Sequence, residues 1–285
     1  MSEPVIGPRP YALQDLSHTA FAARLAEKPV IVLALGSQEE QGPHAPMGDF
    51  LAAERIAMAA CAQAGAICAP VLPFGYAEFF RGFPGGMQLR GDTFRAVLRD
   101  MIDSFLDHAI AHVVIVNGHS TNAPLIAEVC QEVRRRTGVL VPAIHLWRSL
   151  PDAVWAEAHG ADASAARGHG ADPVTSVMMH LSPELVNLDA ASPARRKPVF
   201  GLPSDPHFAS AHFAGISLDL PLDATEVADD GVGSGDPALC TPEAGAIFTR
   251  FLTDHVASFL AHWRQCDPTR PTRAPGNIAP ESPTA

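Results

Sequence analysis

The sequence lacks the features that mark several large classes of protein. It contains no uninterrupted apolar run of about 18 residues, so no transmembrane helix is expected. The first residues, Met1-Ser2-Glu3-Pro4, lack the basic and apolar regions of a signal peptide. The five cysteines among 285 residues form no CxxC pair, which favours reduced thiols. These absences predict a cytoplasmic protein with no membrane partner.

Common nucleophile and nucleotide-binding motifs are also missing. The segment Gly118-His119-Ser120-Thr121-Asn122 is not the GxSxG elbow of a serine hydrolase. No P-loop or GxGxxG is present, since the glycine-rich stretch 231–236 does not open a helix after a strand. A net charge of -11 argues against a nucleic-acid partner held by phosphate contacts.

The sequence does contain alternating apolar strands and amphipathic helices. Its composition, 47% hydrophobic and 18% charged, is that of a globular protein with a sizeable core. Buried strands alternating with helices at crossover spacing predict an α/β fold. We expect a three-layer αβα sandwich with a mainly parallel central sheet. The predicted strands cover 29–35, 66–71, 113–116 and 139–144, and the helices between them cover 49–64, 92–109 and 122–137.

The rest of the chain has weaker patterns. Ser17 is a candidate cap for a helix reaching Glu27, and the composition of 242–263 predicts a last amphipathic helix. Further helices are expected over 153–158 and 172–180, and short strands near 197–202 and 214–220. We expect one domain over 1–266 and a disordered Pro/Thr-rich tail over 267–285.

Ionisable residues gather in the loops that follow the predicted strands. The loop from Gly36 contains Glu39, His44 and Asp49, and the loop after the third strand contains His119. Because strand-end loops of one parallel sheet meet at the same edge, these groups can converge. Glu, Asp and His at one point could bind a divalent metal. A polar loop in which Asp49 caps the following helix is the alternative.

The loop over 72–91 is long, glycine-rich and aromatic. Long loops within compact domains are usually functional, although local packing of the aromatic rings is an alternative explanation. As a pocket wall, this loop would cover the apolar part of a substrate. The candidate substrate-binding residues are Tyr76, Phe79, Phe80 and, from the loop after the third strand, Ser120.

Four loops taken together resemble one known family. Members of the creatininase (creatinine amidohydrolase) family show G-S-x-E-x-H-G-x-H-x-P, then F-P-G-T, N-G-H-x-x-N and a late H-G-G or H-A-G. The resemblance covers roughly residues 28–265 by order and spacing. The matching segments are Gly36-Ser37-Gln38-Glu39-Glu40-Gln41-Gly42-Pro43-His44-Ala45-Pro46, Phe83-Pro84-Gly85-Gly86, Asn117-Gly118-His119-Ser120-Thr121-Asn122 and His169-Gly170-Ala171.

The resemblance implies a metal-dependent hydrolase that cleaves a C–N (amide) bond, often in a small cyclic amide, and that is usually a homohexamer. It assigns Glu39, Asp49 and His119 as ligands of a divalent ion, with Zn²⁺ favoured over Mn²⁺ or Fe²⁺ and one or two ions per subunit. It assigns His169 as the proton carrier and His44 as a residue lining the site.

Two departures from the family pattern concern a second ion. Gln41 stands where the family has a histidine ligand, and Thr121 stands where creatininase has a glutamate. Neutral amide and hydroxyl groups are poor ligands for a divalent metal. The second site is therefore weakened unless His44 or Asp172 supplies ligands. Glu40, next to the predicted ligand Glu39, is expected to face solvent.

Two other functions remain open at this stage. A family member that has lost catalysis could act as a ligand-binding or oligomeric scaffold. An active member could instead hydrolyse a lactone or a cyclic ketone. Whether the substrate is an amide, a lactone or a cyclic ketone, a metal-activated water would attack its carbonyl group. For an amide, His169 would protonate the leaving nitrogen.

Overall fold

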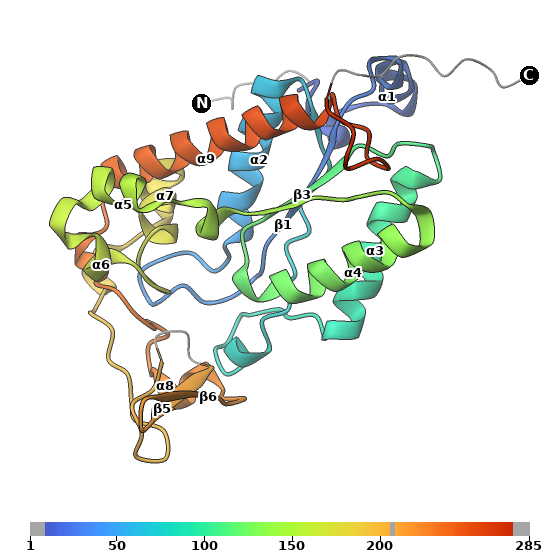
Figure 1. The fold of residues 1–285 in the computed structure, drawn as a ribbon. Coiled ribbons are helices and arrows are strands. Elements are labelled where there is room, and N and C mark those ends of the chain that lie inside the picture. The colour runs from blue at the N-terminus through green and yellow to red at the C-terminus, as the bar shows by residue number, and fades with distance from the viewer. Residues whose placement is uncertain (1–8, 206–208, 276–285) are drawn as a thin grey trace, which may run out of the picture.

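A four-stranded parallel sheet forms the centre of the computed structural model, which describes residues 9–205 and 209–275. The strands are β1 (Ile31–Leu35), β2 (Ile67–Cys68), β3 (Val113–Asn117) and β4 (Ala143–His145), in the spatial order β2-β1-β3-β4. The two central strands, β1 and β3, are labelled in Figure 1. In the register of the two central strands, Leu35 pairs with Asn117. The loops that leave β1 and β3 therefore start side by side.

Helices cover both faces of this sheet, as the alternation of side chains along β1 requires. Val32 and Ala34 pack into a core formed with one group of helices, whereas Ile31, Leu33 and Leu35 pack into a core on the opposite face. The first face carries α2 (Phe50–Ala64), α5 (Asp152–His159), α7 (Val174–Leu181) and α9 (Pro242–Trp263), and the second carries α3 (Gly91–Leu106) and α4 (Ala123–Thr137). The predicted three-layer α/β fold is confirmed.

Several helix ends follow from local sequence signals. The Ser17 hydroxyl accepts a hydrogen bond from the Ala20 amide and caps α1 (His18–Arg24). Two helices stop at a glycine in the left-handed region: α2 at Gly65, with φ 65°, and α4 at Gly138, with φ 78°. The last helix, α9, has the bounds predicted for it.

The outer strands and the region after β4 differ from the prediction. β2 and β4 are shorter than expected because Pro70 and Pro142 have no amide proton to donate to a strand neighbour. The strand expected near 197–202 is wrong, since Val199 and Leu202 form only an isolated bridge. The small elements here are α6 (Ala163–Ala166), the antiparallel hairpin β5 (Ser210–Phe213) and β6 (Ile216–Asp219), and α8 (Ala224–Val227).

Segments near the two ends of the chain flank the sheet. The Cys68 amide in β2 donates to the Tyr11 carbonyl at 2.7 Å, and the Leu140 amide before β4 donates to the Pro268 carbonyl at 2.8 Å. Residues 267–275, where the disordered tail was expected to begin, thus have a defined course. Residues 1–8, which bear on the signal-peptide prediction, and 276–285 lie outside the described residues. Within the described ranges, no helix has the length and apolar character to span a membrane.

Substitution of two isoleucines tests how much the core around the sheet contributes to the free energy of unfolding. Ile115 in β3 is 0% exposed, and Ile216 in the β5–β6 hairpin is 64% exposed. We expect Ile115→Ala to lower the free energy of unfolding by about 2–5 kcal/mol, because it leaves a cavity in the core. The matched change Ile216→Ala should alter it by less than about 0.5 kcal/mol. Urea denaturation followed by circular dichroism measures both, and equal losses would contradict this placement of the core.

Candidate metal centre

Three ligand-type side chains converge at the carboxyl end of the two central strands. Glu39 comes from the loop after β1, Asp49 directly precedes α2, and His119 follows β3. The Nδ1 atom of His119 lies 2.9 Å from Asp49 Oδ2 and 3.2 Å from Glu39 Oε2. One ligand atom from each residue lies within 4.8 Å of the others, and all three residues are buried. We call these residues the triad.

Two glycines allow the triad loops to approach α2 closely. A Cβ atom on Gly36 would lie 2.3 Å from the Cα of Phe50, the first residue of α2. A Cβ atom on Gly118 would lie 2.8 Å from the Cβ of Ala53. Any larger residue at either position would push a ligand-bearing loop away from the helix that carries Asp49.

Buried amide side chains tie the loops together. Asn122 donates through Nδ2 to the Gly36 carbonyl at 3.2 Å and accepts the Tyr76 amide at 2.8 Å. Asn117 donates to the His119 carbonyl at 2.6 Å. The loops after β1, β2 and β3 are therefore held in a fixed relation, which the convergence of three ligands requires.

His119 and Asp49 are each oriented by further hydrogen bonds. The His119 Nε2–H donates to the Tyr76 carbonyl at 3.1 Å, and the Thr121 hydroxyl contacts both groups. The Ser37 amide donates to Asp49 Oδ1 at 2.7 Å. Because Nε2 keeps its proton, Nδ1, which faces the two carboxylates, is the nitrogen that would bind a metal once its own proton is displaced.

Two residues of the triad have raised pKa values, as is usual for metal ligands in the absence of an ion. Burial raises the pKa of Asp49 to about 6, although the charge and hydrogen bond of His119 oppose the rise, and Glu39 adds a smaller upward contribution. Burial alone would lower the pKa of His119, but the charges of Glu39 and Asp49 outweigh it and raise that pKa well above the usual value. Without a cation, therefore, these groups retain protons that a divalent ion would displace.

The donor set fits a divalent cation. Glu39 Oε2 is buried and has no hydrogen-bond partner among the described residues, although it lies 3.2 Å from His119 Nδ1. Asp49 makes no side-chain cap on α2, so the alternative reading as a helix cap does not hold. Two carboxylates and one imidazole directed at a common point match the ligands that Zn²⁺ or Mn²⁺ takes in proteins.

Two further predicted ligands lie in other surroundings. His44 Nε2 lies 3.3 Å from the Thr175 hydroxyl, and its buried Nδ1 has no partner among the described residues. Asp172 accepts hydrogen bonds from the Ser176 amide and hydroxyl, and its Oδ2 lies 2.6 Å from His159 Nε2. The structure thus groups neither residue with the triad.

The remaining candidates surround a second histidine. His169 Nε2 lies 2.7 Å from Glu40 Oε1, so the expectation that Glu40 faces solvent is wrong. The Phe80 ring stacks on the His169 imidazole with centroids 4.4 Å apart, and Phe79 packs on Phe80. Tyr76 contributes its carbonyl to His119, while Ser120 is exposed at the start of a single turn.

Sequence reasoning missed the roles of Glu40, Asn117 and Asn122. The motif N-G-H-x-x-N contained a signal for the asparagines, because an amide on each side of a ligand histidine can bridge neighbouring loops. No periodic signal exists for Glu40, since adjacent residues in an irregular loop have no fixed facing direction.

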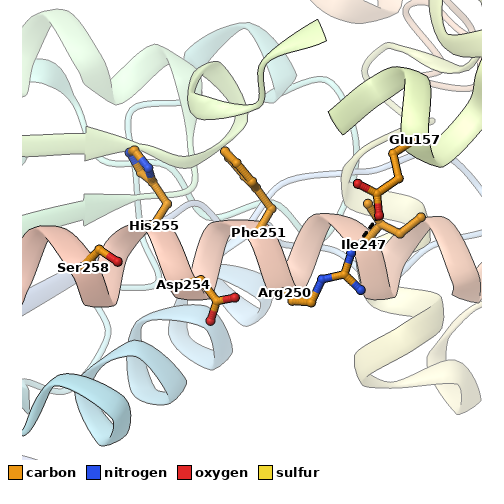
Figure 2. A pocket seen from close by; sticks show the side chains of 7 residues that line it. All are labelled: Glu157, Ile247, Arg250, Phe251, Asp254, His255 and Ser258. Carbon is orange, nitrogen blue, oxygen red and sulfur yellow. Dashed lines mark hydrogen bonds and ion pairs between the residues drawn. The ribbon is translucent and has the colours of Figure 1, made fainter. Parts of the chain in front are cut away.

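A groove along α9 lies apart from the triad. Figure 2 shows its lining, in which Arg250 pairs with Glu157 at 2.7 Å and His255 stands on the same helix. None of the triad residues lines it. The groove offers control positions for experiments on the metal centre.

The fold and the triad together define a class: an α/β sandwich with a candidate metal-ligand set at the strand ends. The family model described as creatininase, creatinine amidohydrolase, matches residues 14–260, so the chain belongs to the creatininase family, a family of hydrolytic enzymes. The prediction of this family is thereby confirmed.

Individual relatives agree with this assignment. The chain is 25% identical to the mycofactocin precursor peptide peptidase of Mycobacterium ulcerans (strain Agy99), over 82% of this chain and 86% of the relative. It is 28% identical to the creatinine amidohydrolase of Pseudomonas putida, over 67% of this chain and 81% of the relative. The solved structure of a manganese form, "Creatininase Mn", superposes with a TM-score of 0.71 at 23% identity, covering 88% of this chain and 97% of that one.

The raised pKa values predict how metal affinity depends on pH. We expect Zn²⁺ affinity to fall steadily as the pH is lowered, because a proton on His119 competes with the ion throughout, and to fall more steeply below about 6, where Asp49 is protonated as well. Isothermal titration calorimetry of metal-stripped protein from pH 5 to 8 measures this. An affinity independent of pH over that range would contradict the protonated state of the metal-free triad.

Proposed function

We propose that this protein is a metal-dependent amidohydrolase that cleaves a C–N bond in a small cyclic amide. The observation that carries the proposal is the buried convergence of Glu39, Asp49 and His119 on one point. A divalent ion bound there supplies Lewis acidity, which lowers the pKa of water and polarises a carbonyl group. The ligands hold that chemistry at the carboxyl edge of the sheet, where substrates of open α/β folds bind.

His169 is the proposed proton carrier. Its side chain is 19% exposed, so substrate can reach it, whereas the triad side chains are almost fully buried. Burial would lower the pKa of His169, but the charge and hydrogen bond of Glu40 raise it above its usual value. A histidine that keeps its proton near neutral pH can donate it to the leaving nitrogen.

The neighbours of the triad support one ion per chain. Gln41 Nε2 donates to Glu39 Oε1 at 3.1 Å, so an amide occupies the place of the histidine found in the family pattern. The Thr121 hydroxyl contacts His119 Nε2 and the Tyr76 carbonyl, in place of the glutamate of creatininase. Neutral side chains that hydrogen-bond to Glu39 and His119 thus stand where the family pattern has two further metal ligands.

The substrate class rests on the aromatic loop and on the relatives. Tyr76 and Phe79 are partly exposed, and Phe80 packs on His169. The exposed aromatic side chains can therefore stack on the ring of a cyclic substrate close to His169. The names of the two relatives denote an amidohydrolase and a peptidase, both of which act on amide-type bonds. By family resemblance, we further propose Zn²⁺ as the resident ion, a cytoplasmic location and a homohexamer.

Replacing the imidazole ligand tests the proposed function directly. We expect His119→Ala to lose bound metal and hydrolysis together, because two carboxylates without their third ligand bind the ion poorly. Metal content by mass spectrometry and turnover of a panel of creatinine, a cyclic imide, a lactone and a short peptide measure the two effects. The matched variant His255→Ala changes an exposed histidine in the α9 groove and should retain both properties.

Each outcome of this experiment has a distinct reading. Full turnover by metal-free His119→Ala protein would exclude the proposed chemistry. A wild-type protein that binds no Zn²⁺ or Mn²⁺ and turns over nothing in the panel would favour the scaffold. Turnover of the lactone alone would show that the enzyme cleaves a C–O bond instead of a C–N bond.

A double substitution tests the number of ions. We expect wild-type protein to bind one Zn²⁺ per chain, and Gln41→His/Thr121→Glu to bind two, because the double variant restores a charged and an imidazole ligand. Mass spectrometry under native conditions counts the ions. The control Gln41→Asn/Thr121→Ser preserves neutral side chains and should remain at one. Two ions in wild-type protein would contradict the proposed single site.

A further inference from the structure

The adjacent carboxylates Glu39 and Glu40 serve different histidines. Glu39 faces His119 in the triad, whereas Glu40 Oε1 lies 2.7 Å from His169 Nε2. The second oxygen of Glu40 accepts the Gly42 amide at 2.8 Å. The Glu40 side chain is only 8% exposed, so its charge is balanced inside the protein rather than by water.

The segment around Gly231 packs against both Glu40 and His169. Gly231 has a φ of 78°, and a Cβ atom there would lie 1.9 Å from Glu40 Oε2. Only glycine therefore fits against the carboxylate. Two residues further on, the Gly233 amide donates to the His169 carbonyl at 3.0 Å, which fixes the backbone of the histidine.

The imidazole is also restrained on its face. The Phe80 ring stacks on it with an interplanar angle of 23°, and Phe80 is itself buried at 3% exposure. Contacts at one ring edge, at one ring face and at the backbone leave His169 little freedom to rotate. Such restraint is what a group that must meet a substrate atom in one orientation requires.

We propose that Glu40 is the positioning residue for His169: its carboxylate takes the Nε2–H, holds the ring in place and fixes Nδ1 as the nitrogen that exchanges a proton with substrate. This inference rests on the proposed function of His169. The family pattern G-S-x-E-x-H leaves position 40 unspecified, so the resemblance gives Glu40 no role. The contacts of Glu40 with His169 and with the Gly42 amide, and the close approach of Gly231, are the basis for the proposed role.

The size of the effect follows from related arrangements. Removing the hydrogen-bond partner that orients a functional histidine typically lowers activity by about 10- to 100-fold. A glutamine at position 40 keeps an oxygen that can accept the Nε2–H, although without the charge. Orientation and turnover should therefore be largely retained in Glu40→Gln and lost in Glu40→Ala.

The test compares full-length, zinc-loaded wild type with Glu40→Ala, Glu40→Gln and the control Glu184→Ala, which removes an exposed glutamate. With the substrates of the panel turned over by wild type, we expect Glu40→Ala to lower kcat by about 10- to 100-fold with little change in KM. Zinc content should stay at the wild-type level in all variants. Glu40→Gln should recover most of kcat, and Glu184→Ala should match wild type.

A second measurement does not depend on turnover. In protein labelled with ¹⁵N-histidine and recorded at a pH above the His169 pKa, the signals of His169, assigned through His169→Gln, should report a neutral ring with its proton on Nε2 in wild type and in Glu40→Gln. They should change in Glu40→Ala. If wild type hydrolyses nothing in the panel, the proposed function fails, while these signals still decide whether Glu40 fixes the ring.

Three results would overturn the inference. One is a Glu40→Ala protein with wild-type kcat and unchanged His169 signals. Another is loss of zinc from Glu40→Ala in step with activity, which would show that Glu40 supports the triad instead. The last is a second zinc ion in wild type that disappears in both Glu40→Ala and His169→Gln, which would make the pair a ligand set.

Discussion

Glu39 and Asp49 bring two carboxylates to the same imidazole nitrogen, out of contact with water. Two neighbouring carboxylate charges that are buried are unfavourable unless a cation lies between them or protons neutralise them. Burial, with a smaller contribution from Glu39, raises the pKa of Asp49, and the charges of both carboxylates raise the pKa of His119. Much of the surrounding structure serves to keep the ligands together despite the repulsion between the carboxylates, including the glycines at the loop starts and the buried asparagines.

The loop after β1 contacts two different histidines because its consecutive glutamates, Glu39 and Glu40, point in different directions. One carboxylate completes the buried triad, and its neighbour restrains the more exposed imidazole of His169. A short stretch of backbone thereby sets the relation between the proposed metal ligand Glu39 and the proposed proton carrier His169. Gln41, the next residue, adds an amide hydrogen bond to Glu39 and so distinguishes this chain from the two-ion pattern.

Much of this arrangement could be predicted from the sequence. The order of strands and helices followed from apolar runs and amphipathic spacing, because these patterns directly encode burial on a sheet. The convergence of the loops that carry Glu39, Asp49 and His119 could be predicted because parallel strands end at one edge, whereas their selection as ligands rested on the family resemblance. The facing of Glu40 could not be predicted, since an irregular loop has no period. The pairing of Asp172 with His159 depends on how α5 packs beside α7, which no local pattern specifies.

The contacts of the chain ends with the sheet have a consequence for solubility. Open strand edges offer unpaired amides and carbonyls that can recruit strands from another molecule and start aggregation. Here Tyr11 occupies the outer side of β2, and Pro268 receives an amide just before β4. A chain shortened at either end would uncover these groups, and its tendency to self-associate would rise even though every residue of the triad remained in place.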